Sequence, residues 1–339
     1  MVGAIFPGQG SQKVGMGEEF FENFPRYAKV FEEANDTLGY DLKDLVLNGP
    51  ADKLQLTEFT QPALLATSFA TYRVVKDMGE LEVHAAAGHS VGEYAALVAS
   101  GVIAFSDALR LVQLRGKLMQ EAVPVGEGGM AAVMGLDADE VKKLCSWACQ
   151  ENKDTPLSPA NFNSPAQTVI SGRKSLVDFV VKNFSPDKIG SDKTKVRIIP
   201  LKVSAPFHCS MMMKAEKGMA KAINEVDFKT PKFGIAQNVS AKIEKDPEVI
   251  KKNLISQITG AVRWVECMNA LKEAEVELLG EFGPGNVLTG LIKKIDPDQF
   301  ISVPLNAISD LKSFDKQVES HNEKMERKKR LGGGGYGDL

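Results

Sequence analysis

The chain of 339 residues has little cysteine, little histidine and no long apolar run. Four cysteines are too few for a disulfide-stapled secreted scaffold. No histidine or third cysteine lies near Cys145 and Cys149 to complete a zinc set. No run approaches the roughly 18 apolar residues that a membrane-spanning helix needs. We therefore expect reduced thiols, no metal and no membrane association.

The chain also has no excess of charge of one sign. Its 41 basic and 44 acidic side chains give a net charge of -3, which excludes the global basic field of a nucleic-acid-binding protein. The 43% hydrophobic and 25% charged fractions are those of a globular protein. An apolar segment begins at Val2 without a basic leader. We expect a cytoplasmic protein, although a plastid or mitochondrial enzyme without its transit peptide would look the same.

Strand-like and helix-like segments alternate in the two outer parts of the chain. Val2–Pro7 and Val83–Gly88 have the apolar composition of buried strands, and helical segments follow them. The alternation stops near residue 125 and resumes near residue 203. Such alternation favours a mainly parallel sheet covered by helices. We predict one discontinuous α/β, hydrolase-like domain over residues 1–125 and 203–318.

The segment between these parts has a different order of elements. Residues 126–202 show a β-α-β-β-α-β pattern, which is typical of a ferredoxin-like α+β subdomain inserted into the larger domain. Residues 319–339 are strongly polar and contain Gly332–Gly335, so we predict a helix end followed by a flexible tail.

One short motif has the spacing of a nucleophile elbow. Gly88-His-Ser-Val-Gly92 follows an apolar strand and precedes a helix-forming segment. In Gly-x-Ser-x-Gly elbows, small residues allow the sharp turn that exposes the serine hydroxyl at the sheet edge. The alternative is an ordinary glycine-rich turn. The context favours Ser90 as a nucleophile.

A serine nucleophile needs a base, and only four histidines are available. His89 adjoins Ser90 on a tight turn, His84 lies earlier on the same strand, and His321 lies in the polar C-terminal segment. His208 alone lies at a strand-to-helix junction, where catalytic groups of α/β sheets gather. Elimination therefore favours His208 as the base over a purely structural role.

Five motifs in the same order resemble those of the malonyl-CoA:acyl-carrier-protein transacylases. The similarity extends over about residues 2–318, and the inserted subdomain falls where that family has it. The motifs are Phe6-Pro-Gly-Gln-Gly-Ser-Gln12, Gly88-His-Ser-Val-Gly-Glu-Tyr-Ala-Ala96, Leu114-Arg-Gly-Lys-Leu-Met-Gln120, Ala205-Pro-Phe-His208 and Gly283-Pro-Gly-Asn-Val-Leu-Thr-Gly290.

The resemblance implies a ping-pong acyl transfer. Ser90 would attack the malonyl thioester of coenzyme A, with His208 as base, and the phosphopantetheine thiol of acyl carrier protein would then take the malonyl group. The family's oxyanion-hole N–H groups map onto Gln9 and Val91. Its histidine-orienting backbone carbonyl maps onto Gln257.

The resemblance also implies a set of substrate-binding residues. Arg115 would bind the malonyl carboxylate through its guanidinium fork, unless it is a solvated arginine on a helix face. Phe207 would crowd the α-methyl group of methylmalonyl. Met119, in the same motif as Arg115, would also contact the substrate. Asn161 and Asn163 would face the cleft, unless they only form a turn.

The partners implied are malonyl-CoA and acyl carrier protein. The resemblance implies no cofactor, since the coenzyme A thioester is a substrate and the partner carries the phosphopantetheine. We expect a monomer. Because carrier proteins are acidic, one of two basic groups is expected to dock them, unless both are ordinary solvated surface. The first group, on the small subdomain, is Lys182, Lys188, Lys193, Lys195 and Arg197. The second, after His208, is Lys214, Lys217 and Lys221.

Three other functions remain open. An α/β-hydrolase-type serine thioesterase would also use the elbow, but would place Asp or Glu and then a late histidine after the serine. The late histidine here, His321, is poorly placed. A trans-acting polyketide acyltransferase would share the motifs. A non-enzymatic scaffold that only binds carrier protein would not need Ser90, His208 and Arg115 intact.

Overall fold

The computed structural model describes residues 1–79, 81–203 and 205–332, with side chains described as far as residue 323. The flexible tail that we predict beyond the C-terminal helix falls largely on residues 333–339, outside the described residues. Among the described residues, no helix is both long and apolar enough to cross a membrane.

The large part of the molecule is built on a six-stranded sheet with the order β10-β9-β1-β2-β7-β8. All neighbouring strands are parallel except β7 and β8. Every residue of β1, β2 and β9 is buried, as expected for central strands that are covered on both faces. The strands are β1 (Val2–Phe6), β2 (Ala85–Gly88), β7 (Gly234–Ala236), β8 (Ile243–Glu244), β9 (Leu278–Phe282) and β10 (Ile301–Leu305).

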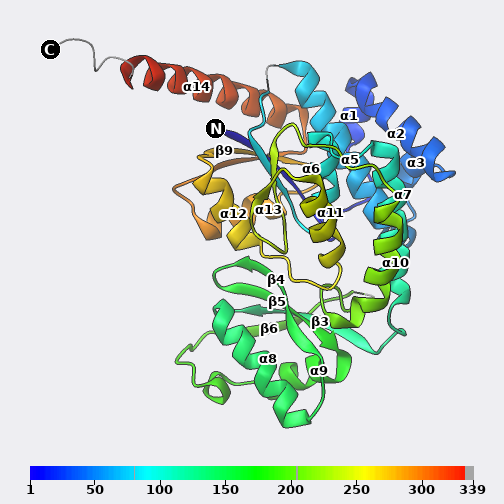
Figure 1. Cartoon of the computed structure of the whole chain (residues 1–339), viewed down its shortest axis with the longest axis vertical. Coiled ribbons are helices and arrows are strands. Elements are labelled where there is room, and N and C mark those ends of the chain that lie inside the picture. Colours follow the sequence, from blue (N-terminus) through cyan, green and yellow to red (C-terminus); the bar gives the residue numbers. More distant parts are fainter. Residues whose placement is uncertain (80, 204, 333–339) are drawn as a thin grey trace.

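Helices cover both faces of this sheet (Figure 1). Alternate residues of β1 point to opposite layers: Val2, Ala4 and Phe6 belong to the core shared with α2, α5, α6 and α7, whereas Ile5 belongs to the core shared with α12 and α13. The helices are α1 (Glu18–Asn23), α2 (Pro25–Leu38), α3 (Leu42–Asn48), α4 (Ala51–Gln55), α5 (Thr57–Met78), α6 (Gly92–Ser100), α7 (Phe105–Glu121), α10 (Met213–Asn224), α11 (Pro247–Ser256), α12 (Trp264–Glu273), α13 (Val287–Ile295) and α14 (Ile308–Gly332).

The small part is a four-stranded antiparallel sheet with the order β4-β5-β3-β6. Two helices pack on one of its faces and form a separate core. This strand order and the β-α-β-β-α-β sequence are those of a ferredoxin-like fold, so the predicted fold class is confirmed. The elements are β3 (Gly128–Met134), α8 (Ala138–Asn152), β4 (Leu157–Ser164), β5 (Gln167–Arg173), α9 (Lys174–Asn183) and β6 (Arg197–Pro200).

The N-terminal segment contains helices that the sequence analysis missed. No helix or strand was predicted between residues 8 and 60, where the structure has α1 to α4. The helix α2 buries Tyr27, Val30, Phe31 and Ala34. Their spacing is that of one face of a helix, so the sequence pattern does predict α2. The other three helices have only 5 to 7 residues, too few for two turns of apolar periodicity.

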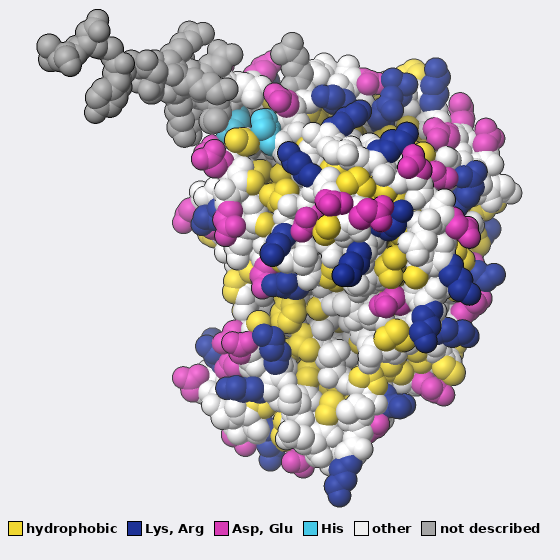
Figure 2. Space-filling view, in the orientation of Figure 1, with side chains coloured by type: hydrophobic (Ala, Val, Ile, Leu, Met, Phe, Trp, Pro, Cys, Tyr) yellow, Lys and Arg dark blue, Asp and Glu magenta, His cyan; other side chains and the backbone are white. Residues whose placement is uncertain are grey.

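The two parts meet along β4. The N–H of Phe162 donates to the carbonyl of Val262 (2.9 Å), and the N–H of Val262 donates to the carbonyl of Ala160 (2.8 Å). Hydrophobic surface gathers around the junction of the two parts, and charges of both signs are scattered over the rest of this face (Figure 2). The free face of the small sheet therefore lies against the carboxyl ends of the large sheet's strands.

Candidate active site

The nucleophile elbow joins β2 to α6. Ser90 has φ 54°, the left-handed region that a non-glycine residue rarely adopts. A Cβ on Gly88 would lie 2.0 Å from the carbonyl carbon of Gly92, and one on Gly92 would lie 2.2 Å from the carbonyl oxygen of Phe6. Both glycines are therefore required by close backbone approach. The turn places Ser90 at the end of a central strand, as the motif predicts.

His208 lies within hydrogen-bonding distance of the nucleophile. Its Nε2 is 2.7 Å from Ser90 Oγ. Its Nδ1 is 2.9 Å from the backbone carbonyl of Gln257 and 3.1 Å from that of Gly260. Because carbonyl oxygens only accept, Nδ1 carries the proton and Nε2 faces the hydroxyl as an acceptor. This tautomer is the one that a general base requires.

The surroundings keep His208 neutral. Burial, and then the positive charge of Arg115, lower the pKa of His208 from its usual 6.5 to about 3. The ring is therefore unprotonated at neutral pH and free to accept the hydroxyl proton. Among the described residues, no carboxylate contacts the ring, so its orientation comes from backbone carbonyls.

The other three histidines lie elsewhere. His84 is exposed, and His321 lies on α14 with Nδ1 3.6 Å from Glu277. His89 lines the cavity, but its Nε2 lies 2.8 Å from Asn163 Oδ1 on β4. It therefore links the elbow to the small sheet rather than acting on Ser90.

Arg115, on α7, is a buried cation beneath the nucleophile. Only 1% of its surface is exposed. It donates from Nη1 to Gln61 Oε1 (2.9 Å) and from Nη2 to Gln257 Oε1 (2.9 Å) and Ser90 Oγ (3.1 Å). No carboxylate within the described residues forms an ion pair with it, and its Nε has no partner there. Burial lowers its pKa. The site therefore holds a desolvated positive charge that forms no direct ion pair, while the buried Glu93 nearby raises the pKa of Arg115 electrostatically.

The N–H groups of Gln9 and Val91 are available to a ligand. In the part of the chain that the structure describes, neither donates to a protein acceptor. The loop that carries Gln9 packs against the elbow, since a Cβ on Gly8 would lie 2.5 Å from the carbonyl oxygen of His89. Gln9 lines the same cavity as Ser90. This arrangement can offer two N–H donors to an oxyanion.

A cavity of about 440 Å³ connects these groups. Ser90, His208, Gln9 and Phe207 line it from the large part, and the small sheet contributes Met130, Ala132, Asn161, Asn163 and Val169. Asn161 and Asn163 thus face the cleft as predicted. Among the described residues, no cluster of three or more His, Cys, Asp or Glu side chains is placed to hold a metal ion.

The contact of Met119 with the substrate stays a prediction. This residue lies one turn after Arg115 on α7 and is 1% exposed, but its side chain packs in the main core and is not among the described residues that line the cavity. Helical spacing places the two residues on one buried face. From that face, Arg115 donates to Ser90 Oγ.

The site also contains residues that the sequence analysis missed. Gln61 holds Arg115, and Asn238 holds the backbone of the elbow. Both are buried, and each lies at least 50 residues from its partner in the chain. A fully buried polar side chain next to a strand end is a signal in the structure. The sequence offers no spacing that would reveal it.

Comparisons with known proteins agree with this geometry. The acyl transferase domain family matches residues 4–291. A malonyl CoA-acyl carrier protein transacylase of Haemophilus influenzae is 43% identical over 301 residues, covering 88% of this chain and 94% of the relative. One from Escherichia coli strain K12 is 44% identical, covering 86% of this chain and 91% of the relative.

Solved structures give the same result. An acyl carrier protein S-malonyltransferase from Vibrio cholerae superposes with a TM-score of 0.86 at 43% identity, covering 92% of this chain and 99% of that one. A malonyl-transacylase solved in complex with a type II polyketide acyl-carrier protein has the same TM-score at 42% identity, covering 92% of this chain and 98% of that one. This chain therefore belongs to the acyl transferase family, among the malonyl-CoA:acyl-carrier-protein transacylases.

Proposed function

We propose that this protein transfers the malonyl group from malonyl-CoA to the phosphopantetheine thiol of acyl carrier protein, a reaction of fatty-acid biosynthesis. The observation that carries the proposal is the buried Arg115 guanidinium 3.1 Å from the hydroxyl of an activated serine. Of the acyl groups that Ser90 could carry, those with a carboxylate can form an ion pair with this guanidinium. Malonyl has a carboxylate, whereas acetyl does not.

In the first half-reaction, Ser90 Oγ attacks the thioester carbonyl while His208 Nε2 takes the hydroxyl proton. The N–H groups of Gln9 and Val91 stabilise the oxyanion. When the tetrahedral intermediate collapses, the carbon–sulfur bond breaks and the imidazolium gives its proton to the departing thiolate. The products are a malonyl-serine ester and free coenzyme A.

The second half-reaction runs the same steps in reverse. The phosphopantetheine thiol gives its proton to His208 and attacks the ester, and the proton then returns to Ser90 as its Oγ leaves. Because the pKa of His208 is about 3, the ring holds the proton only during each transfer. The backbone carbonyl of Gln257 keeps the ring in the required orientation throughout.

Phe207 is proposed to set a weaker preference between acyl groups. It is 8% exposed and lines the cavity directly before the base. Its ring would crowd an α-methyl substituent, which favours malonyl over methylmalonyl. Hydrophobic contacts of this size discriminate by only about 1–3 kcal/mol.

A second cavity supports a path for the pantetheine arm. It has a volume of about 640 Å³, is lined by Lys195, Arg197 and Lys294, and shares Gln167 with the catalytic cavity. These cations suit the phosphate groups of coenzyme A and of phosphopantetheine. Reversing the charge of Lys195 and Arg197 should raise KM for malonyl-CoA and for carrier protein. The same change at Lys214 and Lys217 on α10 tests the alternative docking face.

Intact-protein mass spectrometry tests the reaction. Incubation with malonyl-CoA should add one malonyl group to the wild type and none to Ser90→Ala. Adding carrier protein with its phosphopantetheine should remove the adduct and transfer it to that thiol. A thioesterase would instead release free malonate without a thiol acceptor. An absent adduct, or the same adduct on Ser90→Ala, would refute the proposal.

A further inference from the structure

The loop after β7 contributes a buried side chain that contacts the elbow on both sides of His89. Asn238 is fully buried. Its Oδ1 accepts from the backbone N–H of Ser90 (2.8 Å), and its Nδ2 donates to the backbone carbonyl of Gly88 (2.7 Å). One side-chain amide therefore satisfies a donor and an acceptor of the strained turn.

This contact continues the sheet where the backbone can no longer do so. The ladder between β2 and β7 ends at the pair Ala87 and Ala236. Beyond it the chain turns at Ser90, whose N–H has no backbone acceptor among the described residues. A planar side-chain amide offers a donor and an acceptor in one plane, as a peptide unit does. Asn238 thus replaces the next rung of the ladder.

The loop that carries Asn238 is held from the elbow side by Glu93. The Glu93 carboxylate, in the first turn of α6, accepts from the backbone N–H of Asn238 (2.7 Å) and from Nε2 of Gln237 (3.2 Å). Burial raises the pKa of Glu93 to about 7, and these hydrogen bonds oppose that rise. A buried carboxyl is costly unless it is paired in this way, so its position indicates a fixed loop.

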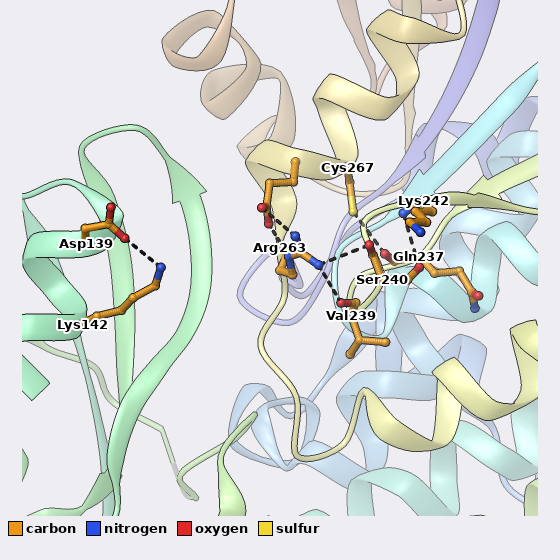
Figure 3. Close-up of polar contacts among 9 residues, drawn as sticks. Asp139, Lys142, Gln237, Val239, Ser240, Lys242, Arg263 and Cys267 are labelled. Atoms are coloured by element: carbon orange, nitrogen blue, oxygen red, sulfur yellow. Dashed lines mark hydrogen bonds and ion pairs between the residues drawn. The ribbon is translucent and has the colours of Figure 1, made fainter. Parts of the chain in front are cut away.

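The loop is also held by the N-cap residue of α12 and by a residue within that helix. Arg263 donates from Nη1 to the carbonyls of Val239 (3.1 Å) and Ser240 (3.2 Å), and the Cys267 Sγ lies 3.5 Å from the carbonyl of Gln237 (Figure 3). These contacts fall on the residues on either side of Asn238 in the chain. The loop is therefore fixed from two directions, and the Asn238 amide is aimed at the elbow.

Gln257 completes the set of contacts around Ser90. Its Nε2 donates to the Ser90 carbonyl (3.0 Å) and to Asn238 Oδ1 (3.1 Å). Side chains thus contact both backbone polar groups of the nucleophile, and the Ser90 carbonyl also accepts from the backbone N–H of Glu93 (3.0 Å). A residue at φ 54° persists only where its surroundings fix it.

We propose that Asn238 is a positioning residue for the nucleophile. Its amide holds the Ser90 backbone so that Oγ points to His208 and the adjoining Val91 N–H points to the oxyanion. Asn238 is not among the described residues that line the cavity, so it acts through Ser90 and not on the substrate. The inference rests on the proposed malonyl transfer only for the identity of the acyl group.

The test uses Asn238→Asp, which keeps the shape but replaces the donor, and Asn238→Ser, which removes both contacts and leaves room for water. Asn253 offers matched controls, because its Nδ2 donates to Gln237 Oε1 (2.8 Å) in the same network without touching the elbow. Asn253→Asp and Asn253→Ser therefore make the same substitutions at a residue that contacts the Asn238 loop but not the elbow.

Two rates are measured on the folded variants: labelling of Ser90 by a fluorophosphonate, and malonyl-adduct formation. We expect both to fall on the order of 100-fold for the Asn238 variants, as for a small displacement of a reacting group. KM for malonyl-CoA should stay near the wild-type value, and the Asn253 controls should react like the wild type.

Wild-type rates in either folded Asn238 variant, or equal losses in the Asn253 controls, would overturn the inference. If Asn238→Asp does not fold, Asn238→Ser decides the question alone. The fluorophosphonate separates this test from the proposed function, since it needs an aligned Ser90 but no malonyl group. Wild type that reacts with the probe but not with malonyl-CoA would refute only the proposed function.

Discussion

Replacing Arg115 by alanine should convert a malonyl-selective enzyme into one that no longer distinguishes malonyl from acetyl. The guanidinium is already desolvated and is held by Gln61 and Gln257. A carboxylate that reaches it therefore gains its hydrogen bonds without having to reorganise the site. Acetyl has no carboxylate and forms no ion pair with the guanidinium.

The structure sets the size of the effect. A hydrogen bond to a charged group contributes about 1.5–3 kcal/mol, so a two-pronged contact contributes about 3–6 kcal/mol. Since 1.4 kcal/mol is a factor of ten, kcat/KM for malonyl-CoA should fall by about 100- to 20,000-fold in Arg115→Ala. The value for acetyl-CoA should hold or rise. Arg115→Lys keeps the charge without the fork and should give an intermediate value.

The assay is transfer to carrier protein, with malonyl-CoA and acetyl-CoA compared in the same preparation. Arg110→Ala is the matched control, because Arg110 lies on the same helix with its side chain 60% exposed in an ion pair with Asp107. It should change neither value. Thermal unfolding checks that each variant is folded. Equal losses for the two substrates in Arg115→Ala would mean that Arg115 has a structural role and does not bind the malonyl carboxylate.

Three further predictions concern the base, the glycines and acyl selection. Because the pKa of His208 is about 3 in the native state and near 6.5 when exposed, the unfolded chain binds a proton that the native state does not between these values. The free energy of unfolding should therefore fall as pH drops from 6.5 towards 3. Urea titrations at several pH values should show a shallower dependence of this free energy on pH for His208→Gln than for the wild type. An equal dependence would contradict the lowered pKa of His208. Gly92→Ala should abolish folding or Ser90 labelling, since its Cβ would lie 2.2 Å from a carbonyl oxygen. A Cβ at Gly290 would meet nothing within 4 Å, so Gly290→Ala should raise stability by about 0.5–1 kcal/mol. Similar melting temperatures for the two variants would mean that the close contact at Gly92 does not matter. Phe207→Ala should raise the methylmalonyl-to-malonyl ratio of kcat/KM about tenfold or more in a competition assay, and an unchanged ratio would remove Phe207 from acyl selection.

Local chemistry in the sequence was enough to predict the nucleophile. The two glycines around Ser90 are required by contacts within a few residues, and the apolar strand before them is fully buried. The base followed from the scarcity of histidine, and the structure places His208 2.7 Å from Ser90 Oγ. The order of elements in residues 126–202 likewise predicted the ferredoxin-like sheet, since strand order there follows from short connections.

The sequence was weaker where several positions on one helix share a buried face. The resemblance implied that Arg115 and Met119, four positions apart on α7, both contact the substrate; the structure places both on a buried face and only shows the contact of Arg115 with Ser90. Short helices such as α4, with 5 residues, left no periodic signal at all. Periodicity shows that a side chain is buried, but not which neighbour it meets.

What the sequence by itself determined is the chemistry of Ser90, because an elbow is a local steric requirement. Only the tertiary structure decided how that serine is held and what lies beneath it. Three side chains hold the Ser90–Arg115 pair from far away in the sequence. Gln61 lies 54 residues from Arg115, and Asn238 and Gln257 lie 148 and 167 residues from Ser90. Such contacts depend on how the helices and both sheets close around the cleft, and no spacing in the sequence records that closure.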